Sequence, residues 1–420
     1  MRVTELALED FRSYERTTLQ LEPGITAFVG PNGEGKTNLL EAVHLLARGD
    51  SPRARDDQEM VRWGAVLARV SATVERAYRP SGPALPAPGV GAPVSEAAGR
   101  AYEPQSTDSK RVEVLLFSPP PGERRRPRRY LVNGAGKRAE DALGTIIVVA
   151  FFPEDVELLT AAPAARRRYL DAMIGQVDRP HRTDTREYAR VVEQRNALLR
   201  AFAAGRDPEV EAVVPTQELA FWDTELCRLA ARISIRREEA VRQLVPAFER
   251  DATRFAGAAG TTLAYQAQAP GATAEERESA YLALLREKRD RELWQGTTLV
   301  GPHREDLLLT GDGRPFASFA SRGEQRSAVL ALKLAEAGWL RDRSGDPPVF
   351  LLDDVLSELD PGRREALVAS LPDDAQTLLT AALPAGLPPG VVQRARVVQI
   401  PLQPVEGGSL EAGTAGSDRR

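Results

Sequence analysis

The chain has 420 residues, which is too long for one ordinary hydrophobic core, so we expect two or more domains. Its formal net charge of −4 excludes nucleic-acid binding by overall charge, so any such binding needs local basic patches. A single cysteine, Cys227, excludes an internal disulfide framework and favours the cytoplasm. The three histidines form no zinc-type cluster, and the chain has neither a signal-peptide pattern nor an apolar run that predicts a membrane span.

A phosphate-binding loop stands near the N-terminus. Segments 3–8 and 17–21 have strand-like patterns, and we expect them to pair and lead into a buried strand at 25–29. The next eight residues, GPNGEGKT at 30–37, match the P-loop pattern G-x-x-x-x-G-K-[ST] at every fixed position. An apolar helix at 38–46 follows, so the loop should end at a helix N-terminus, where the helix dipole favours an anion.

This loop predicts that the protein binds ATP and Mg²⁺. Glycines let backbone N–H groups turn inward to cradle phosphates, Lys36 reaches the terminal phosphates, and the Thr37 hydroxyl holds Mg²⁺. The predicted nucleotide contacts are Gly30, Pro31, Asn32, Gly33, Glu34, Gly35, Lys36, Thr37 and Asn38. Arg12 and Tyr14 lie between the first two strands, either as a turn with an aromatic anchor or as contacts to adenine or phosphate.

Two arginine-bearing segments are candidates for DNA contact. Arg53 and Arg55 follow the P-loop helix in a polar loop, where they face phosphates or DNA, or are simply solvated. The basic stretch 123–129 is either a solvated loop or an edge that binds phosphates by charge and fork geometry. Its arginines are Arg124, Arg125, Arg126, Arg128 and Arg129.

The middle of the chain changes composition twice. Between strands expected at 66–78 and 112–117, residues 81–109 are rich in Pro, Ala, Gly and Ser, which predicts a disordered insert. From 161 to 295 the pattern is helical, and leucines at 3–4–7 spacings form either a plain helical core or an interhelical seam. We therefore expect an all-helical lobe with short coiled coils. An Asn-Gly pair at 133–134 predicts a hairpin turn.

The last third of the chain adds further site residues. Ser321, Gly323 and Glu324 stand at the start of a helix at 327–340 and predict a second anion site. A buried strand at 349–352 ends in Asp353 and Asp354, and such a strand should not end in paired acids without a cation or a reaction to serve. We interpret it as a Walker B strand, with Asp353 on Mg²⁺ and Asp354 polarising the attacking water.

These motifs, in this order, resemble ABC-type ATPases of the SMC class and, more closely, the RecF family of bacterial recombinational repair proteins. The resemblance is carried by Pro153-Glu154-Asp155 through Pro163 with 167–171, by Gly301-Pro302-His303-Arg304, and by 351–360. His303 is either a hydrogen-bonded structural residue or a catalytic one. The chain departs from the family at Ala161, where glycine is usual. It departs from many ABC ATPases at Thr380, where they carry a switch histidine, and at Asp354, where they carry glutamate.

The resemblance implies an α/β fold: an ABC-ATPase-type head, with a mixed sheet around the P-loop helix, and an inserted all-helical lobe. The head would comprise 1–160 and 296–402, the lobe 161–295, and a disordered tail 403–420. It implies an ATP-dependent homodimer in which Ser321, Gly323 and Glu324 meet the nucleotide of a second subunit. It also implies binding to duplex DNA and single-strand/double-strand junctions, RecR and RecO as partners, loading of recombinase at gaps, and slow ATP hydrolysis as a release switch.

Other classes fit the sequence less well. An ABC transporter subunit should have a membrane partner and a much shorter separation between P-loop and Walker B than the roughly 315 residues found. A structural SMC-like DNA tether needs a far longer heptad insert, and a nuclease needs a separate acidic metal cluster, which the sequence lacks.

Overall fold

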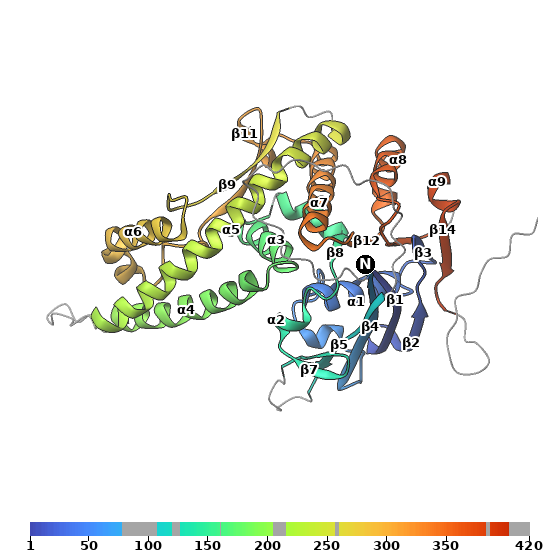
Figure 1. The fold of residues 1–420 in the computed structure, drawn as a ribbon, viewed down its shortest axis with the longest axis horizontal. Helices are drawn as coiled ribbons and strands as arrows, with labels where there is room; N and C mark the ends of the chain where they lie inside the picture. Colours follow the sequence, from blue (N-terminus) through green and yellow to red (C-terminus); the bar gives the residue numbers. More distant parts are fainter. Residues whose placement is uncertain are drawn as a thin grey trace, which may run out of the picture.

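The computed structural model describes most of the chain (Figure 1). The described residues are 1–77, 107–119, 127–159, 161–204, 216–256, 260–383 and 387–402. They form two large sheets with a helix between them, and a helical arm that extends away from the sheets (Figure 1). Among these residues, no helix is long and apolar enough to cross a bilayer.

A parallel sheet positions the site. Its strand order is β14-β3-β13-β12-β8, with β14 (Ala395–Gln399), β3 (Ile25–Val29), β13 (Thr377–Ala381), β12 (Val349–Leu352) and β8 (Val148–Phe151). Every residue of the four strands β3, β13, β12 and β8 is buried, as expected for strands covered on both faces, and this explains their continuous apolar sequences. The predicted P-loop and Walker B strands, β3 and β12, therefore lie on either side of β13.

An antiparallel sheet lies on the other side of the P-loop helix. Its order is β2-β1-β4-β5-β6-β7, with β1 (Arg2–Phe11), β2 (Tyr14–Gln20), β4 (Leu67–Ala77), β5 (Thr107–Phe117), β6 (Arg129–Val132) and β7 (Ala135–Lys137). Helix α1 (Lys36–Arg48) packs against strands of both sheets and is buried over 10 of its 13 residues. The predicted hairpin is confirmed, since Asn133 and Gly134 both have positive φ between β6 and β7.

The prediction of a disordered insert at 81–109 is wrong at its C-terminal end. Thr107 to Ser109 belong to β5 and pair with Glu75 to Ala77 of β4. Their polar sequence is typical of a loop. An antiparallel sheet with one solvent-exposed face nevertheless accepts polar side chains, and strand pairing satisfies the hydrogen bonds of their backbone groups. Residues 81–106 lie outside the described residues.

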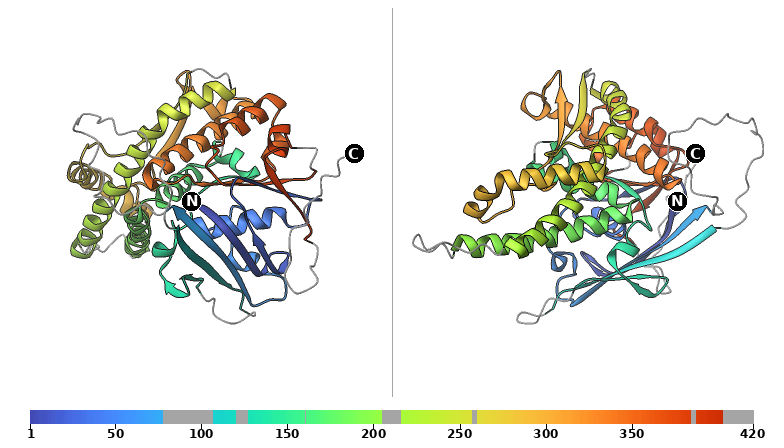
Figure 2. Two further views of the ribbon diagram at one scale, coloured as in Figure 1. Left: turned by 45° about the vertical axis from the view of Figure 1, so that its right-hand side comes forward. Right: turned by 60° about the vertical axis from the view of Figure 1, so that its left-hand side comes forward.

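The arm contains α3 (Pro163–Gly175), α4 (Arg179–Ala204), α5 (Thr216–Ala256) and α6 (Ala274–Gln295). Leu226, Leu229 and Ile233 of α5 are buried in one cluster with Tyr188 of α4 and Tyr281 of α6. The leucine spacing thus serves the core between three helices. Figure 2 shows α4, α5 and α6 projecting away from the two sheets.

The prediction that 161–295 is entirely helical is wrong. Thr261–Gln266 forms strand β9, which pairs antiparallel with β10 (Asp306–Gly311), and β11 (Arg314–Pro315) completes a small sheet. The segment TTLAYQ is rich in β-branched and aromatic residues, and its partner strand lies beyond α6, so local helical periodicity around it hid the pairing. The division of the chain into head and lobe at 160 and 295 stays a prediction, and the tail 403–420 lies outside the described residues.

Within the described residues the remaining helices are α2 (Ala139–Ala142), α7 (Arg322–Ser344), α8 (Pro361–Ser370) and α9 (Pro389–Val392). The 3-10 helices are η1 (Asp57–Met60), η2 (Pro153–Leu159), η3 (Phe316–Ser318) and η4 (Val355–Glu358). The Pro153-Glu154-Asp155 stretch thus forms the start of the 3-10 helix η2.

Candidate nucleotide-binding site

The loop between β3 and α1 has the backbone of a phosphate cradle. Gly33 and Gly35 have φ of 89° and 96°, a region that residues with a side chain rarely adopt. A Cβ on Gly35 would also lie 2.7 Å from Ser13 Oγ and 3.1 Å from the ring of Tyr14. Glycine is therefore required at position 35 both by the backbone conformation and by the close approach of the β1–β2 turn.

Lys36 lies across this loop. Its Nζ donates hydrogen bonds to the carbonyl oxygens of Gly30 at 2.6 Å and Pro31 at 2.7 Å, and the residue is only 8% exposed. The ammonium group is thus held at the loop formed by residues 30–35, where a lysine that contacts terminal phosphates belongs.

The first turn of α1, strand β13 and the end of β12 bring oxygen ligands together beside Lys36. Thr37 Oγ1 and Thr380 Oγ1 each donate a hydrogen bond of 2.8 Å to Asp353 Oδ1. The Asp354 amide donates to Thr380 Oγ1 at 2.9 Å, so Thr380 fixes both acids. Burial raises the pKa of Asp353, with a further contribution from Asp354, although the hydrogen bonds from Thr380 and Thr37 oppose this rise. Thr380 therefore belongs to the site, although the sequence singled it out only as a departure from other ATPases.

The donor set fits Mg²⁺. A hydroxyl and a carboxylate are the hard oxygen ligands that Mg²⁺ prefers, and it usually takes one or two carboxylates together with phosphates and waters. No group of three or more His, Cys, Asp or Glu side chains that could hold a metal occurs among the described residues, and a site completed by nucleotide phosphates does not need one.

Asp354 has a special backbone conformation. Its φ is 51° and its ψ is 15°, and its carbonyl accepts hydrogen bonds from the Ser357 amide at 3.2 Å and the Ser357 hydroxyl at 2.8 Å. The left-handed region is uncommon for a residue with a side chain, and such residues gather at functional sites. The turn 354–357 thus sets the direction in which the predicted catalytic carboxylate leaves the strand.

Arg12 and Arg53 converge on Glu41 of α1, which is fully buried. Arg12 binds both carboxylate oxygens, at 2.9 and 2.6 Å, and Arg53 donates to Oε2 at 2.7 Å and to Asn38 Oδ1 at 2.8 Å. Burial favours the neutral acid, but the hydrogen bonds from Arg12 and Ser51 and the charge of Arg53 outweigh it and lower the pKa of Glu41. Arg53 is thus fixed at the first turn of the P-loop helix, beside the nucleotide site.

Arg12 and Tyr14, which the sequence left as either a turn with an aromatic anchor or nucleotide contacts, have different roles in the structure. The Tyr14 hydroxyl donates to the Gly35 carbonyl at 3.3 Å, so this aromatic ring buttresses the P-loop itself. Arg12 instead ties α1 to η1, since it also donates to the Glu59 carbonyl at 2.6 Å.

The other arginines predicted to contact DNA differ in whether they are exposed or paired within the protein. The side chain of Arg55 is exposed, and exposed Arg129 lies over the Phe117 ring, 5.8 Å from its centroid. Arg128 is held internally, because its Nε donates to Asp57 at 3.0 Å and its Nη1 reaches the Gly49 carbonyl. Arg124, Arg125 and Arg126 lie outside the described residues, so the DNA assignments stay predictions.

The predicted second anion site is a helix start on the surface. Ser321 caps α7: its Oγ accepts from the Glu324 amide at 3.3 Å, and Glu324 Oε2 accepts from the Ser321 amide at 2.7 Å. This capping box supplies hydrogen-bond acceptors for two backbone amides at the start of the helix. Ser321 is exposed, as a residue that meets another subunit must be.

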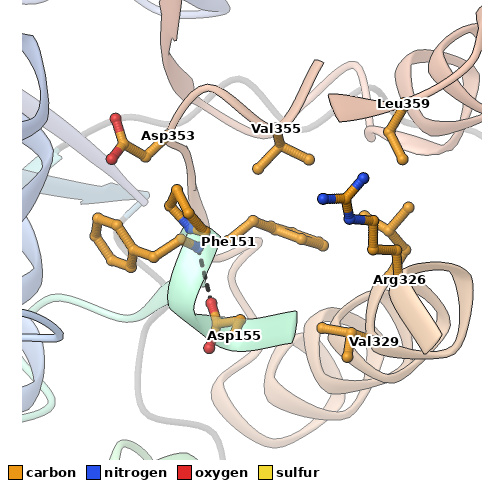
Figure 3. Close-up of a pocket in the computed structure, with 10 residues that line it drawn as sticks. Phe151, Asp155, Arg326, Val329, Asp353, Val355 and Leu359 are labelled. Carbon is orange, nitrogen blue, oxygen red and sulfur yellow. Dashed lines mark hydrogen bonds between the residues drawn. The ribbon is translucent and has the colours of Figure 1, made fainter. Parts of the chain in front are cut away.

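A small pocket separates α7 from the Walker B strand. It holds about 30 Å³ and is lined by Phe151, Asp155, Arg326, Asp353 and Leu359, among others (Figure 3). At its edge Asp155 Oδ2 accepts from the Phe152 amide at 2.8 Å, while Oδ1 lies 3.1 Å from Lys333 Nζ of α7. The Pro153-Glu154-Asp155 motif is therefore a bridge between β8 and α7.

Sequence reasoning missed a buried ionic cluster around α7. Glu336, fully buried, pairs with Arg48 at the end of α1 and accepts from the Tyr169 hydroxyl at 2.9 Å. Lys333, 2% exposed, lies 5.0 Å from the centroid of the Tyr169 ring. The available signal was the placement of Lys333 and Glu336 within the apolar run LALKLAEAGWL. These contacts join the P-loop helix to α7.

The structure favours the structural interpretation of His303. Its Nε2 lies 3.1 Å from the Thr298 carbonyl, which can only accept, so Nδ1 accepts from the Tyr188 hydroxyl at 2.7 Å. Burial lowers the pKa of His303 to about 4, which keeps the ring neutral. Nearby, Arg237 binds Asp171 at 2.8 and 2.7 Å and the Pro302 carbonyl at 2.8 Å. Arg237 therefore links the family motif at 167–171 to the one at 301–304.

Two sheets around the P-loop helix, and a Walker B strand that returns after a long inserted arm, define the class of ABC-type ATPase heads. Residues 2–384 match the family model of the RecF/RecN/SMC N-terminal domain. The chain is 42% identical over 397 residues to the DNA replication and repair protein RecF of Roseiflexus castenholzii, covering 91% of this chain and 93% of that protein. It is 37% identical over 394 residues to RecF of Streptomyces avermitilis, covering 92% and 95%.

The chain belongs to the RecF family. A solved structure of the recombination mediator protein RecF-ATP in the RecFOR pathway is similar with a TM-score of 0.77 at 25% identity, over 95% of both chains. The predicted fold class, an ABC-ATPase-type head with a helical insertion, is confirmed, with β9 as the exception within the insertion.

Proposed function

We propose that this chain is an ATP-gated DNA-binding protein of replication and recombinational repair, which acts in the cytoplasm. The observation that carries the proposal is the 2.8 Å hydrogen bond between Thr37 and Asp353, because it joins the P-loop and Walker B oxygens in one site. Family membership supports it, since the relatives compared are named DNA replication and repair proteins.

In this proposal ATP lies on the P-loop. Backbone amides of 30–38 cradle the phosphates, Lys36 contacts the terminal ones, and Thr37 and Asp353 hold Mg²⁺. Mg²⁺ when bound neutralises phosphate charge. Asp354 orients the attacking water, and its carboxylate is one methylene shorter than glutamate, so we expect hydrolysis to be slow and to act as a release switch.

The site is completed in trans. Ser321 and Gly323 at the exposed start of α7, in the same turn as Glu324, meet the γ-phosphate bound to a second subunit, so ATP joins two heads and hydrolysis releases them. Support comes from the surface position of the capping box at Ser321. A structural tether is less well supported, because the longest helix of the arm, α5, has 41 residues and spans only roughly 60 Å.

The joined heads bind duplex DNA and single-strand/double-strand junctions and act with RecR and RecO to load recombinase at gaps. The similar RecF-ATP structure is of a recombination mediator protein in the RecFOR pathway, which supports this choice of partners. Exposed Arg55 and Arg129 are the described arginines best placed for phosphate contact, and Arg124, Arg125 and Arg126 add charge in the same stretch of sequence as Arg129.

The test is fluorescence anisotropy of a labelled gapped duplex titrated with protein in ATP, in ADP and without nucleotide. We expect tight binding in ATP only, with a matched blunt duplex bound more weakly. Binding that ignores the nucleotide would contradict ATP gating, and no binding in any state would move DNA recognition to a partner.

A further inference from the structure

Arg363 occupies the junction of three elements near the start of α7. It lies in the first turn of α8, where Asp360 caps the helix by accepting from the Arg363 amide at 3.0 Å. The guanidinium Nη1 lies 3.1 Å from the other oxygen of Asp360. Its Nε donates at 3.2 Å to the carbonyl of Phe255 in the last turn of α5. One side chain thus links α8 to the long helix of the arm.

The same guanidinium lies against the first turn of α7. A Cβ built on Gly323 would lie 3.2 Å from Arg363 Nη1, which is tighter than nine in ten real Cβ contacts. Gly323 has no positive φ, so its backbone would accept alanine without strain. Packing therefore explains why position 323 is glycine: the missing side chain leaves room for Arg363.

We propose that Arg363 is a positioning residue for the nucleotide site of the second subunit. It joins the first turn of α7 at Gly323 to Asp360 at the start of α8, so that the turn 321–324 is held in place to meet the partner's ATP. Favourable charge supports this placement, because the guanidinium lies near the carboxylates of Asp360 and Glu324. The inference rests on the proposed ATP-dependent dimer and names a residue that completes it.

Arg363 should act on the assembly of two subunits and not on ATP binding by one subunit. The contacts of Arg363 are with Asp360, Phe255 and the first turn of α7 at Gly323, and these three groups lie outside the P-loop. Its loss should therefore leave ATP binding by a single subunit unchanged. It should weaken only the step in which α7 of one subunit meets ATP on another.

The first experiment measures ATP-dependent self-association by sedimentation in an Asp354→Asn background, which suppresses hydrolysis. We expect Arg363→Ala to raise the dimer dissociation constant at least about tenfold, the scale of one lost charged hydrogen bond, with ATP affinity of the monomer within about twofold. Arg363→Lys, which keeps the charge but not the fork, should be intermediate. The matched control is Arg341→Ala at the other end of α7, where Arg341 forms an exposed pair with Asp374 at 2.7 Å.

The second experiment tests the trans action. Arg363→Ala and Lys36→Met subunits, labelled with different dyes, are mixed with ATP and followed by energy transfer. Their heterodimer contains one intact composite site: the P-loop of the Arg363→Ala subunit and the α7 turn of the Lys36→Met subunit. We expect more association than either variant gives alone.

The outcomes separate the inference from the proposed function. If Arg363→Ala self-associates like the wild type, the inference is wrong. It is also wrong if Ser321→Arg complements Lys36→Met while Arg363→Ala does not. If the wild type itself fails to associate in ATP, the proposed dimer fails, and the inference with it.

Discussion

The hydroxyl of Thr37 and the carboxylate of Asp353 are joined by a hydrogen bond of 2.8 Å, although 316 positions separate them in the chain. Strand β13 lies between β3, which leads into the P-loop, and β12, which ends just before Asp353, and Thr380 of β13 donates to the same oxygen of Asp353. The nucleotide site therefore depends on the pairing of three distant strands, and substitutions at single residues can test this dependence.

Thr380→Val keeps the shape of the side chain but removes a donor to Asp353 and an acceptor for the Asp354 amide. We expect the free energy of unfolding to fall by about 1–3 kcal/mol, since buried polar groups lose their partners. The Mg²⁺ concentration needed for half-maximal ATP binding should rise. Urea unfolding measures the change in stability, and a Mg²⁺ titration measures the change in Mg²⁺ requirement. The control is Thr18→Val on the outer strand β2, which should change the free energy of unfolding by less than about 0.5 kcal/mol.

Lys36→Met should abolish ATP binding and ATP-dependent dimerisation together, because the ammonium that meets the terminal phosphates is lost. Equilibrium binding of a fluorescent ATP analogue and sedimentation with ATP check the two effects. Lys137→Met, at an exposed position of β7, should change neither. Normal ATP binding by Lys36→Met would refute the assignment of the P-loop.

Glu336→Gln should lower the free energy of unfolding by about 3–5 kcal/mol, because it leaves the buried guanidinium of Arg48 without its counter-charge. Denaturant unfolding measures the loss, and Glu365→Gln on the exposed face of α8 provides the control. The double variant Arg48→Met with Glu336→Leu should recover much of the stability, since an apolar pair removes both buried charges. A loss as large as that of Glu336→Gln would mean that the two charges do not act as a pair.

Stability should fall between pH 7 and pH 5. The pKa of His303 is about 4 in the folded protein, below its ordinary value of 6.5, because burial disfavours the charged ring. The unfolded chain thus binds the proton first, so this contribution is complete above pH 6.5 and is lost as the pH falls towards 4. At pH 5 the loss from His303 should be about 2 kcal/mol.

Urea unfolding at the two pH values measures this loss, and His303→Gln should flatten the dependence. A residual slope of the same sign is expected from His44, whose pKa is also lowered by burial. An unchanged slope in His303→Gln would show that the ring does not titrate as the geometry implies.

Replacing the arginines of 124–129 with alanine should weaken DNA binding and flatten its salt dependence by about 0.9 in log–log slope for each lost phosphate contact. Anisotropy at several salt concentrations gives this slope. Arg128→Ala alone should instead act mainly on stability, because Arg128 is paired with Asp57 in the fold. A slope that stays unchanged when all five arginines are replaced would contradict the placement of DNA at this stretch.

The parts of the protein that the sequence predicted are those encoded by neighbouring residues. The P-loop, its flanking strand and helix, the Asn133-Gly134 hairpin and the strand before Asp353 each depend on local backbone conformation or on the periodicity of a short segment. The resemblance to the RecF family has the same origin, because its motifs are contiguous stretches. Glycine at 35 is a clear case, since a positive φ can be anticipated from the loop pattern alone.

What only the tertiary structure decided involves contacts between residues that are far apart in the chain. Strand β9 was missed because its partner, β10, begins 40 positions after the last residue of β9, across helix α6. Arg53 and Arg128 are alike in sequence as loop arginines, but the tertiary contacts place one at the P-loop helix and pair the other with Asp57. The roles of Thr380, Glu336 and Arg363 also arise from packing, because a hydrogen bond or an ion pair depends on distance in space, which local sequence patterns do not encode.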